Sequence, residues 1–264
     1  MSDRYAVIGN PVAHSRSPAI HAEFARATGE DIEYGRIEAP LEGFAQAVER
    51  FRAAGGKGLN VTLPFKREAF ALCARVSERA RLAHSANTLR FEDSFGDNTD
   101  GVGLIRDLSQ NLGVPLNGKA VLLLGAGGAA QGVAGALLDA GARRLVIANR
   151  TVAKAQALAG GFASASACGY ADLGADHFDL VINATSAGLS GASPALPAGV
   201  FDARTLAYDM TYGRETPFMA AARRAGARVS DGLGMLVEQA AESFFVWRGV
   251  RPPTAGVLAK LRGP

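Results

Sequence analysis

Cysteine is almost absent from this sequence: its 264 residues include only Cys73 and Cys168. The two lie far apart and form neither a C-x-x-C motif nor a spacing typical of metal ligands, so the sequence offers no disulfide framework and no zinc site. We expect two free structural thiols. The sequence also lacks an apolar run of membrane-spanning length and a basic, apolar leader before its first expected strand. These absences predict a cytoplasmic protein without a membrane partner.

Charged residues are sparse, at 20% of the chain, and nearly balanced: 28 Lys and Arg accompany 25 Asp and Glu, for a net charge of +3. The arginines are dispersed rather than gathered in blocks, which argues against nucleic acid as a partner. His14 has no acidic or metal-type partner spaced near it, so neither metal chemistry nor a Ser-His-Asp arrangement is indicated. With 48% apolar residues, the chain can fill the core of one large or two medium domains.

A glycine-rich stretch follows the most apolar run of the chain. Residues 120–124 (Ala-Val-Leu-Leu-Leu) predict a strand, and Gly125, Gly127 and Ala130 then fit the pattern G-x-G-x-x-G/A. In that pattern the missing side chains let the backbone turn sharply and approach a pyrophosphate at a helix N-terminus. The pattern alone is weak evidence in a chain with 32 glycines. A second apolar run at 144–148, at the separation that a βαβ unit needs, makes a nucleotide-binding Rossmann unit the better interpretation.

The end of that second strand indicates which nucleotide binds. NAD sites place an acid there for the ribose hydroxyl, whereas NADP sites supply cations for the 2′-phosphate. Here the strand ends in Asn149, Arg150 and Thr151, Lys154 follows, and residues 143–160 contain no carboxylate. The alternative is a solvated Arg150 beside a helix that Thr151 caps. The position favours NADP.

The remaining patterns predict an α/β protein of two domains, a doubly wound parallel Rossmann domain and a smaller α/β substrate domain, with a boundary near residue 101. We expect strands at 4–8, 32–37, within 55–62, at 87–91, ending at 97, near 163, at 178–183, at 206–210 and near 229, and helices at 17–29, 44–54, 77–83, 102–112, 131–140, 152–159, 217–225, 232–247 and after Pro253.

Polar side chains gather where these strands end, in loops that commonly carry ligands. Their hydroxyls and amides suit a polyhydroxylated, carboxylated small molecule: Ser15, Ser17, Asn60, Thr62, Asn87, Thr99 and Tyr212. Lys66 and Asp100 are the candidates for proton transfer. Simpler roles compete with these. Asp100 and Ser17 both stand where a helix N-cap is expected, Asn87 could brace a turn, and most lysines are solvated.

Taken together, the motifs resemble those of bacterial shikimate dehydrogenases over nearly the whole chain. The matching stretches include Gly9-Asn-Pro-Val-Ala-His-Ser-Arg-Ser-Pro18, Gly58-Leu-Asn-Val-Thr-Leu-Pro-Phe-Lys66, 87–88, 97–101, the glycine turn, 149–151, 183–186, 208–210 and 231–236. The resemblance implies reversible reduction of 3-dehydroshikimate to shikimate with NADPH, in aromatic amino acid and chorismate biosynthesis.

The resemblance also implies roles for individual residues. Lys66 and Asp100 would face each other as the acid/base pair. Ser15 and Ser17 would hold the substrate carboxylate, and the other substrate oxygens would contact Thr62, Asn87, Asp100, Tyr212 and Gln239. The cofactor would contact Gly125, Ala126, Gly127, Gly128 and Ala129 at its pyrophosphate, Asn149, Arg150, Thr151 and Lys154 at its 2′-phosphate, and Thr185, Met210 and Gly232 near its nicotinamide, with Glu78 also part of the cofactor site.

The substrate domain would comprise 1–101, completed by 232–264, and the NADP-binding Rossmann domain 102–231. His84-Ser85 and Ala86 depart from the common family pattern, which concerns the packing around Asn87 and not the chemistry. Gln131 and Lys154 replace arginines that are frequent in relatives, so we expect preference for NADP rather than exclusion of NAD. Two alternatives remain open: a quinate/shikimate dehydrogenase of broader specificity, and a non-catalytic NADP-binding regulatory module, which should have lost the Lys66 and Asp100 pair. We expect a monomer or a homodimer.

Overall fold

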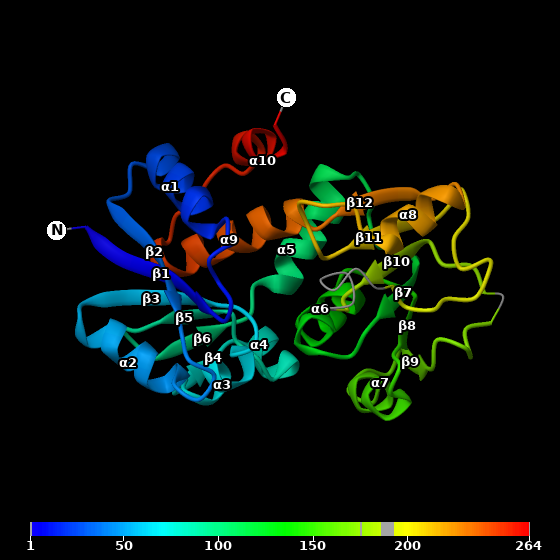
Figure 1. The fold of residues 1–264 in the computed structure, drawn as a ribbon, viewed down its shortest axis with the longest axis horizontal. Coiled ribbons are helices and arrows are strands. Elements are labelled where there is room, and N and C mark those ends of the chain that lie inside the picture. Colours follow the sequence, from blue (N-terminus) through cyan, green and yellow to red (C-terminus); the bar gives the residue numbers. More distant parts are fainter. Residues whose placement is uncertain (1, 175, 186–192, 264) are drawn as a thin grey trace. The chain divides into compact units, whose positions relative to one another are not determined.

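The computed structural model describes residues 2–174, 176–185 and 193–263. The chain divides into two compact units: a first unit of Met1–Gly103 with Leu236–Pro264, and a second unit of Leu104–Met235. Each unit has its own sheet and its own hydrophobic core, and Figure 1 labels their elements. The first unit is therefore built from both ends of the sequence.

The first unit contains a mixed sheet with the strand order β2-β1-β3-β5-β6-β4. Its elements are β1 (Asp3–Gly9), α1 (Ser17–Thr28), β2 (Ile32–Glu38), α2 (Phe44–Ala53), β3 (Gly56–Val61), α3 (Lys66–Ala71), β4 (Arg75–Val76), α4 (Glu78–Ala83), β5 (Thr88–Arg90), β6 (Phe95–Asp97), the start of α5 (Asp100–Arg106), most of α9 (Leu233–Arg248) and α10 (Ala255–Arg262). Strands β1, β2 and β3 are parallel, whereas β5 is antiparallel to both β3 and β6.

Aromatic side chains from helices pack against this sheet. Phe44 of α2 stacks on Phe65, which precedes α3, with ring centroids 4.8 Å apart, and both are fully buried with Leu59 of β3. Trp247 of α9 stacks on Tyr5 of β1 at 4.5 Å. Burying a side chain of this size contributes roughly 2 to 3 kcal/mol. These contacts fix the helices that carry Lys66 and Gln239.

The second unit contains a parallel sheet with the strand order β12-β11-β10-β7-β8-β9. Its elements are the rest of α5, the π-helix η1 (Asp107–Asn111), β7 (Ala120–Leu124), α6 (Gly128–Asp139), β8 (Arg144–Ala148), α7 (Val152–Ala159), β9 (Ala165–Cys168), β10 (Leu180–Asn183), β11 (Leu206–Asp209), α8 (Pro217–Arg224), β12 (Arg228–Asp231) and the start of α9. The order reverses beside β7, as in a doubly wound nucleotide-binding sheet.

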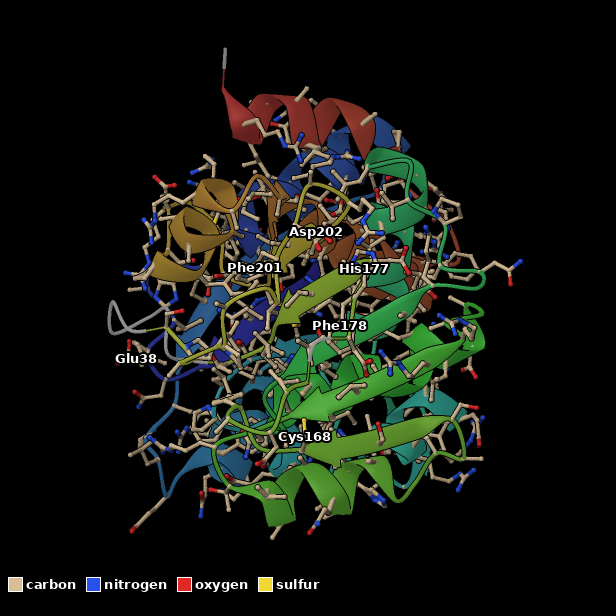
Figure 2. All side chains as sticks on the ribbon, turned by 90° about the vertical axis from the view of Figure 1, so that its right-hand side faces the viewer. Glu38, Cys168, His177, Phe178, Phe201 and Asp202 are labelled. Atoms are coloured by element: carbon tan, nitrogen blue, oxygen red, sulfur yellow. The ribbon has the colours of Figure 1, made fainter. Side chains whose placement is uncertain are left out.

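The central strands of this sheet are apolar throughout, because both of their faces are covered. Every residue of β7 is buried, and Val121 and Leu123 pack with Val133 of α6 while Leu122 and Leu124 pack with Phe218 of α8. Figure 2 shows Cys168 at the end of β9 and Phe178 before β10. The predicted fold class, a Rossmann unit with a second α/β unit, is confirmed.

Several local predictions need correction. Arg16, not Ser17, occupies the N-cap position of α1. Asp100 is the first residue of α5 rather than its cap, and the helix predicted over 102–112 becomes a π-helix at Asp107. The buried Asp107 carboxylate, at the start of this π-helix, accepts hydrogen bonds from Tyr208 at 2.6 Å and from Asn111 at 3.0 Å.

Other differences concern bounds and short elements. Helix α6 begins at Gly128, three residues before its predicted start, because glycine and alanine continue the helix up to the turn. The strand expected near Ala163 is β9, and α3 and β4 were not predicted. Both cysteines are free, as predicted. Across residues 2–174, 176–185 and 193–263, no helix has the length and apolar character needed to cross a membrane.

Candidate active site

Strand directions in the first unit bring distant loops to one edge of its sheet. β1 and β3 are parallel, so the loop after Gly9 and the turn after Val61 leave at the same edge. β5 runs in the opposite direction, with Asn60 opposite Thr88, and β6 reverses again, with Thr88 opposite Asp97. The beginning of β5 and the end of β6 therefore reach that edge as well. We call this edge the site edge.

Lys66 begins α3 directly after the turn that follows β3. Phe65 is fully buried and bonded through its backbone to Thr62 at 3.1 Å, which fixes the start of the helix. The Lys66 side chain is 17% exposed, and its Nζ lies 2.5 Å from Oδ2 of Asp100, whose side chain is 7% exposed. A largely desolvated ion pair of this kind is stable only if its remaining lone pairs find partners.

Asp100 has such partners on its other side. Nδ2 of Asn87 donates to Asp100 Oδ1 at 2.8 Å, so each carboxylate oxygen accepts a hydrogen bond. The position of Asp100 in the first turn of α5 also favours a negative charge, because the helix dipole is positive there. The carboxylate is thus held in one orientation by Lys66, Asn87 and its own helix.

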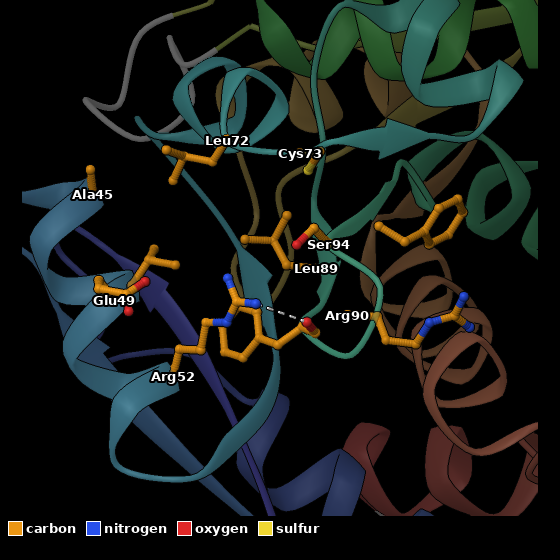
Figure 3. Close-up of a pocket in the computed structure, with 11 residues that line it drawn as sticks. Ala45, Glu49, Arg52, Leu72, Cys73, Leu89, Arg90 and Ser94 are labelled. Carbon is orange, nitrogen blue, oxygen red and sulfur yellow. Dashed lines mark hydrogen bonds between the residues drawn. The ribbon is translucent and has the colours of Figure 1, made fainter.

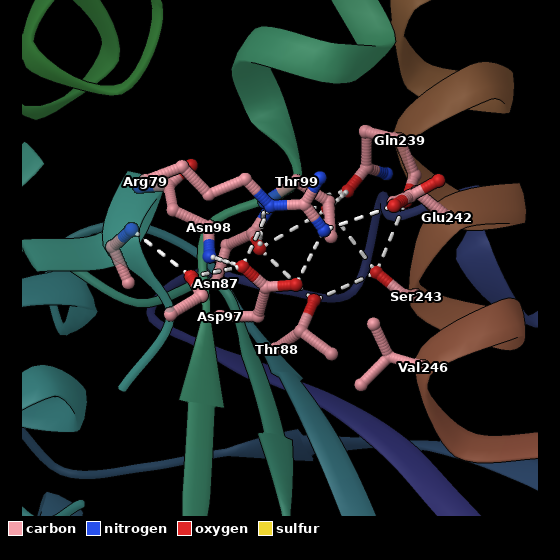
Figure 4. Close-up of polar contacts among 12 residues, drawn as sticks. Arg79, Asn87, Thr88, Asp97, Asn98, Thr99, Gln239, Glu242, Ser243 and Val246 are labelled. Carbon is pink, nitrogen blue, oxygen red and sulfur yellow. Dashed lines mark hydrogen bonds and ion pairs between the residues drawn. The ribbon is translucent and has the colours of Figure 1, made fainter. Parts of the chain in front are cut away.

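Asn87 is the centre of a buried polar cluster at the site edge. It is 2% exposed, and its Nδ2 also lies within bonding distance of Thr99 Oγ1 at 3.0 Å and Gln239 Oε1 at 3.3 Å. Its Oδ1 accepts from the Thr99 backbone N–H at 2.9 Å. Gln239 of α9 faces this cluster, and Figure 4 shows Asn87, Thr99 and Gln239 converging.

The predicted carboxylate-binding serines lie together after β1. Ser15 Oγ donates to Ser17 Oγ at 3.2 Å and accepts from the Ser17 backbone N–H at 3.3 Å. Arg36 of β2 donates to the Ser15 carbonyl at 2.6 Å, which anchors the loop. Thr62 is half-buried directly after β3, at the same edge. The segments with Ser15 and Ser17, with Thr62 and with Asn87 thus all adjoin strands at the site edge.

Sequence reasoning missed an ion network beside this cluster. Arg79 of α4 donates to Asp97 Oδ1 at 2.7 Å and to Glu242 Oε1 at 2.9 Å, and Arg251 pairs with the second oxygen of Glu242. The arginines compensate for the burial of the Asp97 and Glu242 carboxylates. Desolvation lowers the pKa of Arg79, but its hydrogen bonds and ion pairs with Asp97 and Glu242 outweigh this effect, so the pKa is raised. The partners come from three distant segments, so no local spacing marks them.

A separate hollow in the first unit carries none of the predicted residues. It has a volume of about 110 Å³ and lies between α2 and the β5–β6 hairpin, with Val48, Leu72, Leu89 and Phe91 as its apolar lining and Cys73 beside Ser94 (Figure 3). Burial raises the pKa of the Cys73 thiol to about 11, which makes it an unreactive thiol at neutral pH. Because none of its lining residues belongs to the site edge, the hollow is separate from it.

In the second unit, the predicted pyrophosphate residues form a tight turn and a helix start. Gly125 has φ +107°, and a Cβ there would come within 3.2 Å of the Ala184 carbonyl oxygen. Gly127 is the N-cap of α6, and Gly128 and Ala129 form its first turn without any side-chain cap. Backbone N–H groups at such a helix start suit a phosphate. Ala126 is buried, which places the turn firmly on the sheet.

The predicted 2′-phosphate residues follow β8. Arg150, Thr151 and Lys154 are exposed, and Asn149 Nδ2 donates to the Thr151 carbonyl at 2.9 Å, which closes the turn before α7. Thr151 occupies the N-cap position of α7, but its side chain makes no capping hydrogen bond, so its hydroxyl is not used by the helix. The donor set is two cations with an adjacent hydroxyl and no acid, which suits a phosphate monoester.

The residues predicted near the nicotinamide lie beyond the ends of β10 and β11. Asn183 Oδ1 accepts from the Thr185 backbone N–H at 3.2 Å and its hydroxyl at 2.7 Å, and Asn183 Nδ2 donates to the buried Asp209 carboxylate at 3.1 Å. A Cβ on Gly232 would overlap the Met210 backbone, so only glycine fits there. Ser186, part of the family motif, lies outside the described residues.

The predicted substrate residue Tyr212 and the predicted cofactor residue Glu78 lie in different units. Tyr212 is half-buried in the second unit, after β11. Glu78 is the first residue of α4 in the first unit, where it pairs with Arg81 and is 67% exposed. Among the residues placed by the structure, no group of three or more His, Cys, Asp or Glu could hold a metal ion.

A doubly wound sheet with a glycine turn and a basic strand end, together with an α/β unit that holds a paired lysine and aspartate, defines a two-unit nucleotide-dependent dehydrogenase. Three family models match the chain: the shikimate dehydrogenase substrate binding domain over residues 7–89, shikimate / quinate 5-dehydrogenase over 107–190, and the shikimate 5′-dehydrogenase C-terminal domain over 232–262. The chain belongs to the shikimate dehydrogenase family, which confirms the resemblance seen in its motifs.

Individual relatives cover nearly the whole chain. A protein of Aromatoleum aromaticum named shikimate dehydrogenase (NADP(+)) is 60% identical, covering 98% of this chain and 97% of its own. The crystal structure of an Ael1 enzyme from Pseudomonas putida is 51% identical with a TM-score of 0.94, covering 100% of this chain and 99% of its own. A Thermus thermophilus shikimate 5-dehydrogenase, solved in complex with NADP(H) and shikimate, is 37% identical with a TM-score of 0.86, and 98% of each chain is covered.

Proposed function

We propose that this chain is an NADP-dependent shikimate dehydrogenase, which reversibly reduces 3-dehydroshikimate to shikimate, with Lys66 and Asp100 as its acid/base pair. The observation that carries the residue assignment is the 2.5 Å contact between Lys66 Nζ and Asp100 Oδ2, with Asn87 on the other carboxylate oxygen. A carbonyl that is being reduced needs a proton donor at its oxygen, and a positioned ammonium is one. The resulting activity belongs to aromatic amino acid and chorismate biosynthesis.

The roles of the two residues differ. In the direction of reduction, Lys66 Nζ donates a proton to the developing alkoxide and becomes a neutral amine. In the reverse direction, the neutral amine takes the hydroxyl proton and becomes an ammonium. Asp100 keeps Nζ at the reacting oxygen and stabilises its charged form, and Asn87 prevents the carboxylate from turning away. When bound, NADPH would supply the hydride for reduction, and NADP⁺ would accept it in the reverse direction.

Substrate recognition is proposed for the hydroxyls and amides already described. The Ser15 and Ser17 hydroxyls, 3.2 Å apart, can both donate to one carboxylate. Thr62, Asn87, Asp100 and Gln239 supply the donors and acceptors for the remaining oxygens, and Tyr212 of the second unit is assigned to the same substrate. On this basis the first unit is the substrate domain and the second the NADP-binding domain.

The cofactor residues are proposed from chemical fit. Gly125 to Ala129 offer a side-chain-free turn and helix start for the pyrophosphate, and Asn149, Arg150, Thr151 and Lys154 offer cations and donors for the 2′-phosphate. Thr185, Met210 and Gly232 complete the nicotinamide end, and Glu78 remains part of the proposal. We assign the protein to the cytoplasm, whose reducing conditions suit its two free thiols, as a monomer or homodimer.

One assay tests the activity. NADPH formation from shikimate is followed by absorbance at alkaline pH, with quinate in place of shikimate and NAD in place of NADP as parallel reactions. Rapid turnover with shikimate and NADP alone supports the proposal. Comparable turnover of quinate would instead identify a quinate/shikimate dehydrogenase. Binding of NADPH without any turnover of either substrate would identify a non-catalytic NADP-binding module.

A further inference from the structure

Lys66 and Asp100 come from different segments of the first unit, and two other buried residues tie those segments together. Ser85 is fully buried and Asn98 is 2% exposed. Asn98 Nδ2 donates to Ser85 Oγ at 2.9 Å and to the Ser85 carbonyl at 3.1 Å. Both donors of the amide therefore serve one residue.

Hydrogen bonds link these two residues to the two members of the proposed acid/base pair: Asn98 to Asp100, and Ser85, through the adjacent Ala86, to Lys66. Asn98 Oδ1 accepts from the Asp100 backbone N–H at 3.2 Å, next to the carboxylate itself. On the other side, the backbone N–H of Ala86, the residue after Ser85, donates to the Lys66 carbonyl at 2.9 Å. A continuous path thus runs from the Lys66 backbone through Ala86, Ser85 and Asn98 to the Asp100 backbone.

Local geometry holds each end of this path. His84 ends α4 in a left-handed conformation, φ 45° and ψ 37°, which turns the chain so that Ser85 and Ala86 pass Lys66. Asn98 is fixed by its backbone N–H, which donates to Asp97 Oδ1 at 2.7 Å, and Asp97 is in turn paired with Arg79 (Figure 4). Each segment is thus ordered locally by its own contacts, and the Ser85–Asn98 contact joins one segment to the other.

We propose that Ser85 and Asn98 are positioning residues, which set the separation between the Lys66 and Asp100 backbones and thereby the geometry of the acid/base pair. This inference rests on the proposed roles of Lys66 and Asp100. A carboxylate on a short side chain follows its own backbone, so loss of the Ser85–Asn98 contact displaces Asp100 relative to Nζ. Displacements of about 1 Å can cost roughly a hundredfold in rate at such a site.

The mildest test is Ser85→Ala, which removes one acceptor from the Asn98 amide and leaves the Ser85 carbonyl. We expect kcat for shikimate oxidation to fall roughly two- to tenfold, the range for losing one buried hydrogen bond, with KM for shikimate unchanged within about twofold. The matched control is Thr28→Val, which removes a hydroxyl bonded to the Phe24 carbonyl in α1 and should leave both kcat and KM unchanged.

A double-mutant cycle separates positioning from general damage. If Ser85 acts through Lys66, then Ser85→Ala has little further effect on the residual rate of Lys66→Ala. An equal loss of kcat in both backgrounds, a change in KM alone, or an unchanged kcat in Ser85→Ala would overturn the inference. If Lys66→Ala itself kept near-normal turnover, the proposed acid/base pair would be wrong and the inference with it. If Lys66→Ala is inactive but Ser85→Ala is normal, only the positioning role fails.

Discussion

Lys66 Nζ lies 2.5 Å from Asp100 Oδ2, although 34 positions separate the two residues in the sequence. Neither side chain reaches bulk solvent to any large extent, at 17% and 7% exposed. The pair exists because β5 reverses the direction of the sheet between the segments that carry the two residues. A site of this kind depends on the fold rather than on any short motif.

Removal of the lysine tests the acid/base assignment. Lys66→Ala should lower kcat for shikimate oxidation by about 10² to 10⁴, the usual contribution of positioned proton transfer, with a smaller effect on KM. Steady-state kinetics and circular dichroism measure rate and fold together. Lys119→Ala is the control, because Lys119 pairs with Asp179 at 3.0 Å in the second unit and has no proposed chemical role. Near-normal turnover by a folded Lys66→Ala variant would rule out the assignment.

Loss of a carboxylate-binding hydroxyl should act on binding. Ser15→Ala should raise KM for shikimate roughly tenfold and leave kcat within about twofold, because a carboxylate anchor binds ground and transition states alike. Initial rates over a range of shikimate concentrations separate the two parameters. Ser109→Ala, which removes an exposed hydroxyl bonded to the Ile105 carbonyl, should change neither. A loss confined to kcat would contradict the proposed anchor.

Specificity for the 2′-phosphate should depend on Arg150. Arg150→Ala should raise KM for NADP by about tenfold, the effect of losing one charge-assisted hydrogen bond, while KM for NAD stays nearly constant. Steady-state kinetics with NADP and with NAD give the ratio of the two KM values directly. Arg143→Ala, at an exposed arginine near the Gly118 carbonyl, serves as the comparison. An equal rise in KM for NADP and for NAD would mean that Arg150 does not contact the 2′-phosphate.

His21 should make stability depend on pH. The ring is fully buried and stacks on Tyr34 with centroids 4.1 Å apart, and desolvation lowers its pKa to about 3 despite the opposing effect of Asn60. In the unfolded chain His21 binds a proton below about pH 6.5, whereas in the folded chain it stays neutral down to about pH 3. The free energy of unfolding therefore falls as the pH decreases from about 6.5 toward 3. His21 alone should lower the free energy of unfolding by about 2 kcal/mol between pH 7 and pH 5.

The measurement is urea unfolding at pH 7 and pH 5 for the natural sequence and for His21→Phe, which keeps an aromatic ring beside Tyr34. Between pH 7 and pH 5, the free energy of unfolding of the variant should fall by about 2 kcal/mol less than that of the natural sequence. Other groups titrate equally in both proteins, so the difference isolates His21. Identical losses would mean that His21 takes up its proton without unfolding.

Local sequence patterns were sufficient for the regular elements and for the polar residues at strand ends. The run 120–124 and the glycines after it predicted β7, its turn and α6, because strand, turn and helix signals there act over neighbouring residues. The alternation at 32–37 likewise predicted β2. Ser15, Thr62, Asn87 and Asp100 were recognised from their places after or before expected strands.

Two of the missed features involve contacts between distant segments. The Arg79, Asp97 and Glu242 network joins α4, β6 and α9, and Asp107, where the π-helix begins, accepts a hydrogen bond from Tyr208 of β11. Asp100 looked like a cap because sequence spacing cannot show that Lys66 and Asn87 occupy its carboxylate. Family resemblance, rather than spacing, paired Lys66 with Asp100 at the sequence level.

The divided first unit has a consequence for how the protein is made. Gln239, Glu242 and Ser243 lie on α9, so the ribosome delivers them only after the whole second unit has been translated. Domains tend to fold as they emerge. The nascent chain can thus complete its Rossmann sheet while the buried polar cluster around Asn87 still lacks its α9 partners, and the residues made first acquire their final surroundings last.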